Sequence, residues 1–188
     1  MKVFISGGCK NGKSYYAQRL AKAAGEAGGA PLYYIAAMRP VDAEDDERIV
    51  RHRKERDGWG FITVEQYEHV EYILEKCDPR GSFLLDSLTA LLANEMFPTD
   101  GGVNDLAHES IIGGLKRVMD EVGDIVIVSD YIYSDAVIYD TLTEKYRKSL
   151  AALDRAAAEH SDVVVEIAYA SVIVHKGKAL LGGLIMMS

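Results

Sequence analysis

The sequence predicts an α/β fold in which a largely parallel β-sheet is covered by helices on both faces. Apolar segments of strand length alternate along the chain with segments of helical periodicity. Most strand segments are continuous apolar runs, which is typical of strands that are buried on both faces. The last two strand segments are joined by the short connection Tyr169–Ser171, so we expect an antiparallel pair at one edge of the sheet.

Each element is predicted from its own local pattern. Runs of β-branched and aromatic residues predict strands, apolar residues three or four apart predict helices, and clusters of glycine and proline predict loops. In the first half we expect a strand at 2–6, a helix ending at 24, a loop at 24–31, a strand at 32–38, a charged helix at 42–57, a strand at 61–65 and a helix at 70–76. In the second half we expect a strand at 82–88, helices at 91–96 and 106–122, a strand at 124–130, a helix at 140–160 and closing strands at 163–170 and 171–177.

Length and composition favour one globular domain over residues 1–188. The chain is 48% hydrophobic and 27% charged, as is ordinary for a soluble protein of this size. No apolar run approaches the roughly 20 residues that span a bilayer, and the first run is too short for a signal peptide. Cys9 and Cys77 lie far apart, and a disulfide to Cys9 would disturb the glycine-rich loop around it. We therefore expect reduced thiols and a cytoplasmic protein.

The distribution of charge argues against a nucleic-acid partner. The formal net charge is −8, so the protein as a whole repels a phosphate backbone. Residues 1–60 nevertheless carry a surplus of Lys and Arg, whereas the remainder is strongly acidic. A locally basic segment suits a small anionic ligand such as a nucleotide.

The segment GGCKNGKS, after the first strand, has the pattern of a phosphate-binding loop. Its residues are Gly7, Gly8, Cys9, Lys10, Asn11, Gly12, Lys13 and Ser14. Glycines permit a curve that points successive N–H groups at an anion, and the following helix adds its positive dipole end. Lys13 would reach the β- and γ-phosphates, and Ser14 would offer a hydroxyl to Mg²⁺. A glycine-rich turn could match by chance, but the strand, loop and helix stand in the required order. We therefore predict a P-loop NTPase-like fold that binds a nucleotide.

Two carboxylates end apolar strands and should lie beside this loop. The carboxyl ends of parallel strands share one edge of the sheet, where ligands bind, so the loop after Ser6, Asp86 and Asp130 should converge there. Asp86 would hold Mg²⁺ or its water next to Ser14. The alternative is that Asp86 caps the next helix, since Asp is a favoured N-cap. Asp130 has a similar placement.

The charged helix expected at 42–57 contains a histidine between arginines. Arg48, His52 and Arg56 lie four apart and share one face of a helix. Neighbouring positive charges lower the pKa of a histidine, and a neutral imidazole can attack phosphorus while guanidinium groups stabilise the phosphate charge. Taken alone, the residues favour a solvated charged helix with an incidental histidine.

Four segments together resemble a known family: GGCKNGKS, YYIAAM, DDERIVRHRKERDGWGFITVE and LLDSLTALLANEMF. Over residues 1–97 their order and spacing resemble the adenosylcobinamide kinase/adenosylcobinamide-phosphate guanylyltransferases of cobalamin biosynthesis. The resemblance implies phosphorylation of adenosylcobinamide by ATP or GTP, followed by transfer of GMP from GTP through a histidine to give adenosylcobinamide-GDP. It also implies Mg²⁺, a corrinoid substrate and a homo-oligomer, commonly a trimer.

The resemblance implies roles for individual positions. His52 stands where the family carries GMP covalently, in an R-I-x-x-H-R pattern, so His52 and Lys13 would be the catalytic residues. Nucleotide contacts are implied, besides the phosphate loop, at Ala36, Ala37, Met38, Arg53, Lys54, Glu55, Arg56, Glu65 and Asp86.

The second half departs from the family pattern. After IVIVS the family usually shows Asn-Glu-Val-Gly and then Gly-Ile-Val-Pro, whereas this chain has Asp130-Tyr131-Ile132-Tyr133 and then AVIY at 136–139. The later helix usually carries Gly-Arg-x-Asn-Gln, and here it reads AALDR at 151–155. These segments would shape the acceptor site or a subunit contact. Two alternatives therefore stay open: a small-molecule kinase without a covalent histidine, and a nucleotide-sensing module without catalysis.

Overall fold

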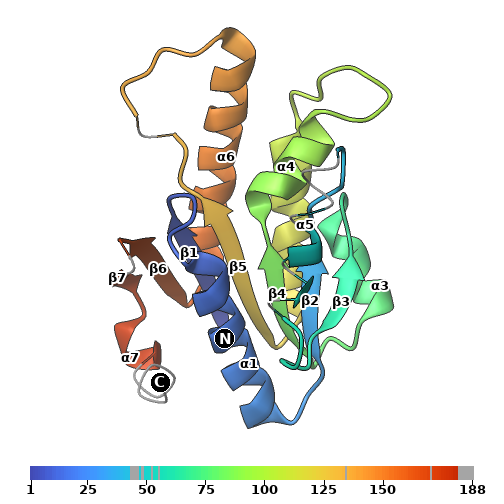
Figure 1. Ribbon diagram of the computed structural model, residues 1–188, viewed down its shortest axis with the longest axis vertical. Coiled ribbons are helices and arrows are strands. Elements are labelled where there is room, and N and C mark those ends of the chain that lie inside the picture. The colour runs from blue at the N-terminus through green and yellow to red at the C-terminus, as the bar shows by residue number, and fades with distance from the viewer. Residues whose placement is uncertain are drawn as a thin grey trace.

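The computed structural model describes residues 1–42, 47, 49–51, 53–54, 56–133, 135–169 and 171–181. Within these residues seven strands form one sheet in the order β3-β2-β4-β5-β1-β6-β7 (Figure 1). The strands are β1 Lys2–Gly7, β2 Leu32–Ala36, β3 Ile62–Glu65, β4 Ser82–Asp86, β5 Asp124–Asp130, β6 Val163–Ala168 and β7 Ser171–Lys176. All pairings are parallel except that of β6 with β7, which is antiparallel at the edge, as predicted.

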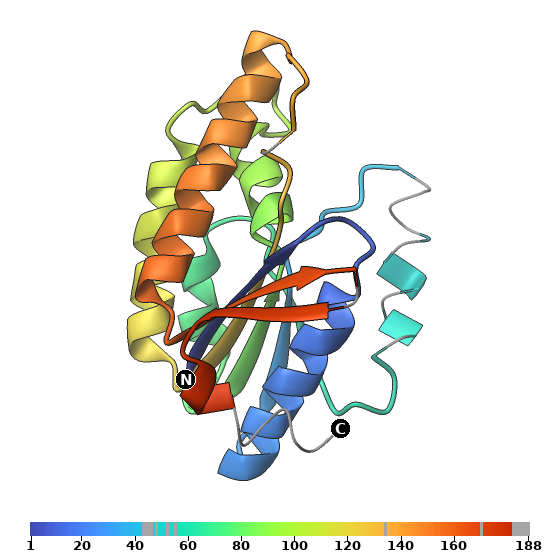
Figure 2. The same ribbon diagram turned by 90° about the vertical axis from the view of Figure 1, so that its left-hand side faces the viewer.

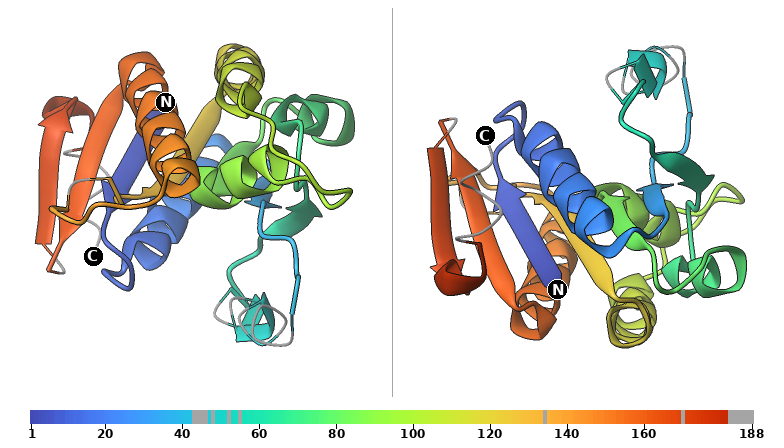
Figure 3. Two further views of the ribbon diagram at one scale, coloured as in Figure 1. Left: turned by 90° about the horizontal axis from the view of Figure 1, so that it is seen from above. Right: turned by 90° about the horizontal axis from the view of Figure 1, so that it is seen from below.

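Helices cover both faces of the sheet, as the sequence predicts. They are α1 Lys13–Gly28, the 3₁₀ helix η1 Val70–Tyr72, α3 Ile73–Lys76, α4 Leu88–Met96, α5 Ala107–Glu121, α6 Thr141–His160 and α7 Lys178–Leu181. Helix α1 lies on one face, and α4, α5 and α6 lie on the other (Figure 3). Among the described residues, no helix combines the length and the apolar composition that crossing a membrane requires.

The two faces carry separate hydrophobic cores because successive side chains of a strand point in opposite directions. In β1, Val3 and Ile5 pack with α1, whereas Phe4 packs with the cluster that contains α4, α5 and α6. In β4, Leu84 packs in the core on the α1 side, and Phe83 packs in the core that contains α4, α5 and α6. This two-sided burial explains why the central strands β1, β2, β4 and β5 are continuous apolar runs in the sequence.

Some predicted boundaries are wrong. Helix α1 continues through most of the expected loop 24–31 and ends at Gly28, where the C-cap Gly29 has φ +60°. Its Gly25 packs against the sheet, where a Cβ would lie 3.4 Å from the Cβ of Ser82, so close packing outweighs the low helix propensity of glycine. Helix α4 begins at Leu88 rather than at 91, and α7 is not predicted.

Candidate active site

A cavity of about 950 Å³ lies at the carboxyl ends of the five parallel strands β1 to β5. The phosphate loop, residues 7–14, forms one wall through Cys9, Lys10, Asn11, Gly12, Lys13 and Ser14. Strand ends contribute Ala36, Glu65, Asp86 and Asp130 to the same cavity. The structure thus brings together the phosphate loop, Asp86 and Asp130, which the strand-end argument placed side by side.

The phosphate loop needs glycine at two positions for different reasons. Gly12 has φ +84°, a conformation that residues with a Cβ rarely adopt. Gly7 lies against β6, where an added Cβ would be 2.3 Å from the carbonyl oxygen of Ile167.

The loop also carries Cys9, an exposed free thiol, while the thiol of Cys77 is buried and free. The expectation of two unbridged cysteines is confirmed.

Lys13 is folded across its own loop. Its side chain is 6% exposed, and its Nζ donates to the carbonyl oxygen of Gly8 at 2.6 Å. The same Nζ lies 2.9 Å from Oδ1 of Asp130, at the end of β5. A buried ammonium group is costly without such partners. Both contacts hold the ammonium at the cavity wall, next to the N–H groups of the loop.

Asp86 is joined to the segment after the charged helix by a chain of contacts. Tyr34 donates its hydroxyl to Oδ2 of Asp86 at 2.9 Å. The guanidinium carbon of Arg56 lies 3.5 Å from the centre of the Tyr34 ring, a cation–π contact, and Arg56 is buried. Helix α4 is capped by Ser87, whose Oγ accepts from the N–H of Ala90, so Asp86 is not the cap.

Ser14 and Asp86 fit the coordination that Mg²⁺ prefers. Ser14 is the last residue of the phosphate loop, and Asp86 lines the same cavity. Mg²⁺ usually keeps several waters and takes one or two protein oxygens together with substrate phosphates. Within the described residues, no group of three or more His, Cys, Asp or Glu could hold a metal by itself. A hydroxyl and a carboxylate beside a bound phosphate are consistent with that chemistry.

A second part of the cavity lining comes from the charged helix and the residues after it. Figure 2 shows this helical segment, in teal, to one side of α1. The described residues between 47 and 54 are helical, and Ile49, Arg51 and Arg53 line the cavity. Arg53 also pairs with Oε1 of Glu65 at 2.7 Å, and Glu65 accepts the hydroxyl of Tyr67. The predicted nucleophile His52, together with Arg48 and Glu55, lies outside the described residues.

The remaining predicted contacts divide into two groups. Met38 and Arg56 line the cavity. Ala37 does not line the cavity, because its side chain is fully buried in the hydrophobic core, and Lys54 is exposed away from the cavity lining. Gly8 takes part through its carbonyl oxygen, which holds Lys13.

Sequence reasoning missed an aromatic part of the cavity lining. Trp59, the single tryptophan of the chain, lines the cavity and packs edge-to-face on Tyr15, with ring centres 5.8 Å apart. Lys22 of α1 lies 5.5 Å from the Trp59 ring. Tyr34 and Tyr67 complete this aromatic set. A tryptophan between two glycines directly after a charged helix was the signal that could have pointed to this wall.

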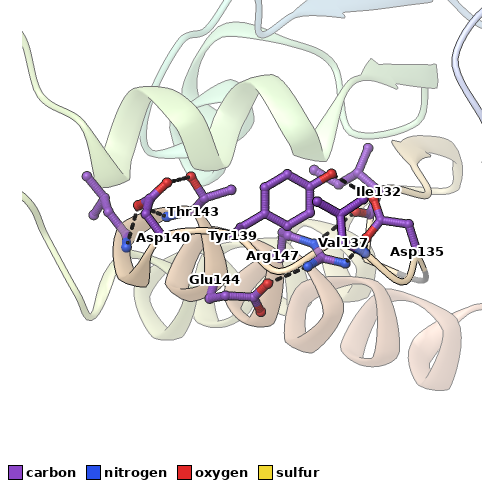
Figure 4. Close-up of polar contacts among 9 residues, drawn as sticks. Ile132, Asp135, Val137, Tyr139, Asp140, Thr143, Glu144 and Arg147 are labelled. Carbon is purple, nitrogen blue, oxygen red and sulfur yellow. Dashed lines mark hydrogen bonds and ion pairs between the residues drawn. The ribbon is translucent and has the colours of Figure 1, made fainter.

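The β5–α6 connection, residues 131–140, is fixed by one buried arginine. Figure 4 shows Arg147 of α6 between Ile132, Asp135 and Glu144. Its Nε donates to the carbonyl oxygen of Ile132 at 3.1 Å, and Nη2 donates to Oδ1 of Asp135 at 2.9 Å. Nη1 donates to Glu144, and the Tyr139 ring covers the guanidinium at 4.6 Å. These contacts order the chain that leaves Asp130.

The carboxylate of Asp154 is buried beneath this connection. Asp154 of α6 is 3% exposed and accepts the hydroxyl of Tyr133 at 2.9 Å. Burial, together with the nearby carboxylate of Asp130, raises the pKa of Asp154 to about 6, and the hydrogen bonds to Asp154 counteract part of this rise. Close by, Tyr146 donates its hydroxyl to the carbonyl oxygen of Thr89 at 2.8 Å, which ties α6 to α4.

Comparison with known proteins identifies the family. The family model described as "Cobinamide kinase / cobinamide phosphate guanyltransferase" matches residues 3–172. The chain belongs to this family. The match includes the phosphate loop, the charged helix and the β5–α6 connection, so it reaches well beyond the segments that carry the resemblance in the sequence.

Individual relatives are similar at moderate identity. The "Bifunctional adenosylcobalamin biosynthesis protein CobP" of Pseudomonas aeruginosa is 28% identical over 164 residues, which cover 87% of this chain and 91% of that protein. The protein CobU of Salmonella typhimurium, with the same description, is 29% identical over 131 residues, covering 69% of this chain and 67% of that protein. A KaiC-like protein from Pyrococcus horikoshii superposes with a TM-score of 0.51 at 13% identity, covering 93% of this chain and 78% of that chain. The P-loop NTPase-like fold is thereby confirmed.

Proposed function

We propose that the protein phosphorylates adenosylcobinamide and then transfers GMP to the product, giving adenosylcobinamide-GDP. The observation that carries this proposal is the composition of the cavity. The phosphate loop forms one wall, and Arg51 and Arg53, the neighbours of position 52, line the same cavity. Phosphoryl transfer requires a loop that binds the phosphates, and transfer of GMP requires a nucleophile in the same cavity. The phosphate loop would serve the first step, and His52, between Arg51 and Arg53, would serve the second.

In the first transfer, the hydroxyl oxygen of the acceptor attacks the γ-phosphorus of ATP or GTP. The bond from that phosphorus to the bridging oxygen breaks, and a nucleoside diphosphate leaves. The N–H groups of the phosphate loop and the ammonium of Lys13 would stabilise the charge on the phosphate oxygens. Ser14 and Asp86 would hold Mg²⁺, which when bound neutralises part of the same charge.

In the second transfer, an imidazole nitrogen of His52 attacks the α-phosphorus of GTP, and pyrophosphate leaves. A phosphate oxygen of the phosphorylated acceptor then attacks the same phosphorus and releases the histidine. Covalent catalysis splits a difficult transfer into two displacements of this kind. Arg51, Arg53 and Arg56 line the cavity, and their guanidinium groups suit the charge that develops on phosphate.

The test uses GTP labelled with ³²P at the α-phosphate, with Mg²⁺ and no acceptor. The protein should take up label and release pyrophosphate, and the label should survive alkali but be lost in mild acid, as a phosphoramidate is. His52→Ala and His52→Asn should take up no label, because neither side chain is a nucleophile. Both variants should still phosphorylate adenosylcobinamide, since that step uses the phosphate loop.

The matched control is His160→Ala, at the exposed end of α6. This variant should label like the wild type. If the wild-type protein takes up no acid-labile GMP but phosphorylates adenosylcobinamide, the protein is a kinase without the guanylyl step. If it binds nucleotide and does neither, it is a nucleotide sensor.

A further inference from the structure

Asp130 occupies a position in the cavity to which the two-step chemistry assigns no role. Its side chain is 27% exposed, lines the cavity and lies 2.9 Å from Nζ of Lys13. An ammonium group has three N–H donors, so Lys13 can bind a phosphate oxygen while it keeps Asp130. The ammonium of Lys13 would therefore contact both the Asp130 carboxylate and a bound phosphate, which places the two close to each other.

The backbone of Asp130 is fixed from two sides. Its N–H donates to Oγ1 of Thr89 in α4 at 3.0 Å, and the N–H of Tyr131 donates to the carbonyl oxygen of Gly7 at 3.0 Å. Asp130 is also the register partner of Gly7, the first residue of the phosphate loop. These contacts hold the carboxylate in place relative to the phosphate loop before any ligand binds, which is the preorganisation that a reacting group requires.

The other carboxylates of the cavity are held by different partners. Asp86 accepts the hydroxyl of Tyr34, and Glu65 is paired with Arg53 and Tyr67. Asp86 lies on β4 and Glu65 lies on β3, and at least one other strand separates each of these strands from β1. Asp130 is on β5, directly beside β1. Of these three carboxylates, it is the one adjacent to the lysine of the phosphate loop.

We propose that Asp130 is the general base of the phosphoryl transfer, which rests on the proposed kinase function. As the acceptor oxygen bonds to the γ-phosphorus, its proton passes to the Asp130 carboxylate, and the nucleoside diphosphate leaves with the electrons of the broken P–O bond. An aspartate that accepts a substrate hydroxyl proton is an established part of phosphoryl transfer.

The test compares Asp130→Asn and Asp130→Ala with the wild-type protein. Single-turnover transfer of the γ-phosphate to adenosylcobinamide should fall at least about 100-fold in both variants, the range for a lost general base. Nucleotide affinity, followed by calorimetry, should be no weaker, because Lys13 remains. Added formate should restore at least tenfold of the lost rate to Asp130→Ala, where it fits the vacated space, and should restore nothing to Asp130→Asn.

The matched control is Asp120→Asn, an exposed carboxylate near the end of α5, at the opposite edge of the sheet. This variant should transfer phosphate at the wild-type rate, with or without formate. A rate of Asp130→Asn within threefold of wild type would overturn the proposal. A loss that extra Mg²⁺ restores, or that formate does not restore in Asp130→Ala, would overturn it in favour of a metal-binding or structural role.

Hydrolysis of γ-labelled GTP by water, measured in the same samples, tests the role of Asp130 separately from the proposed acceptor. A wild-type protein that hydrolyses GTP but leaves adenosylcobinamide unphosphorylated contradicts the proposed acceptor. Asp130 is still tested there, since it would take the proton from water. An equal rate of hydrolysis in wild type and Asp130→Asn would then overturn the base assignment on its own.

Discussion

Replacing Asp154 by asparagine should make the protein more stable at neutral pH and remove part of the pH dependence of its unfolding. Asp154 is buried beneath the β5–α6 connection and accepts a hydrogen bond from Tyr133. Asparagine can accept the same hydrogen bond through its side-chain carbonyl, but it carries no charge. The substitution therefore removes the cost of a buried carboxylate and keeps the shape of the site.

The magnitude follows from the pKa of Asp154, which burial raises from 3.8 to about 6. Because the folded state then binds more protons than the unfolded chain, stability is greatest below pH 4 and is lost as the pH rises through 6. A tenfold change in the acid constant corresponds to about 1.4 kcal/mol, so the full cost is about 3 kcal/mol at neutral pH. About a third of it is already present at pH 4.5, which leaves about 2 kcal/mol between pH 4.5 and 7.5.

Urea unfolding at intervals from pH 4.5 to 7.5 measures this difference. The free energy of unfolding of Asp154→Asn minus that of the wild type should rise by about 2 kcal/mol across this range. Glu159→Gln, an exposed carboxylate on the same helix, is the control and should show no such rise. A constant difference between Asp154→Asn and wild type at all pH values would show that the buried carboxylate is not what makes stability depend on pH.

Three further substitutions test the site and its support. Lys13→Ala should weaken nucleotide binding at least about tenfold, which is the contribution of one charge-assisted hydrogen bond. It should therefore strongly reduce any nucleotide-induced change in Trp59 fluorescence at a nucleotide concentration equal to the wild-type Kd, and an unchanged affinity would contradict the phosphate loop. Asp86→Asn should raise the Mg²⁺ concentration needed for half-maximal rate while nucleotide is saturating, and an unchanged requirement would remove Asp86 from the metal site. Arg147→Gln should lower the free energy of unfolding by about 2–3 kcal/mol, measured in urea, because three hydrogen bonds of a buried guanidinium are lost. Arg117→Gln, which breaks an exposed pair with Glu121, should leave stability nearly unchanged, and equal effects of the two would refute the role given to Arg147.

Most of the fold could be predicted because the central strands β1, β2, β4 and β5 are buried on both faces. Residues 124–130 form β5 with the predicted bounds, and the antiparallel edge follows from the short connection between β6 and β7. The end of α1 could not be predicted, since Gly25 reads as part of a loop while its helical state depends on packing against the sheet. Local propensity is a weak guide where tertiary contacts decide.

The site could be predicted in outline but not in its contacts. Strand ends placed Asp86 and Asp130 near the phosphate loop without any knowledge of the strand order. The pairing of Lys13 with Asp130 depends on β5 lying directly beside β1, and the stacking of Arg56 on Tyr34 depends on how the segment after the charged helix returns to β3. Contacts between residues so far apart in sequence are set by topology, which local patterns do not contain.

The β5–α6 connection departs from the usual family pattern, yet it is built as a unit. A buried guanidinium is tolerated only when its donors are satisfied, and Arg147 finds its partners in Ile132, Asp135 and Glu144. These contacts give the described residues of the segment a defined arrangement against α6. The phosphate loop and Asp86 lie outside this segment and line one cavity, as the proposed nucleotide site requires. Differences from other members of the family are therefore expected in the acceptor, while the chemistry at the nucleotide should be shared.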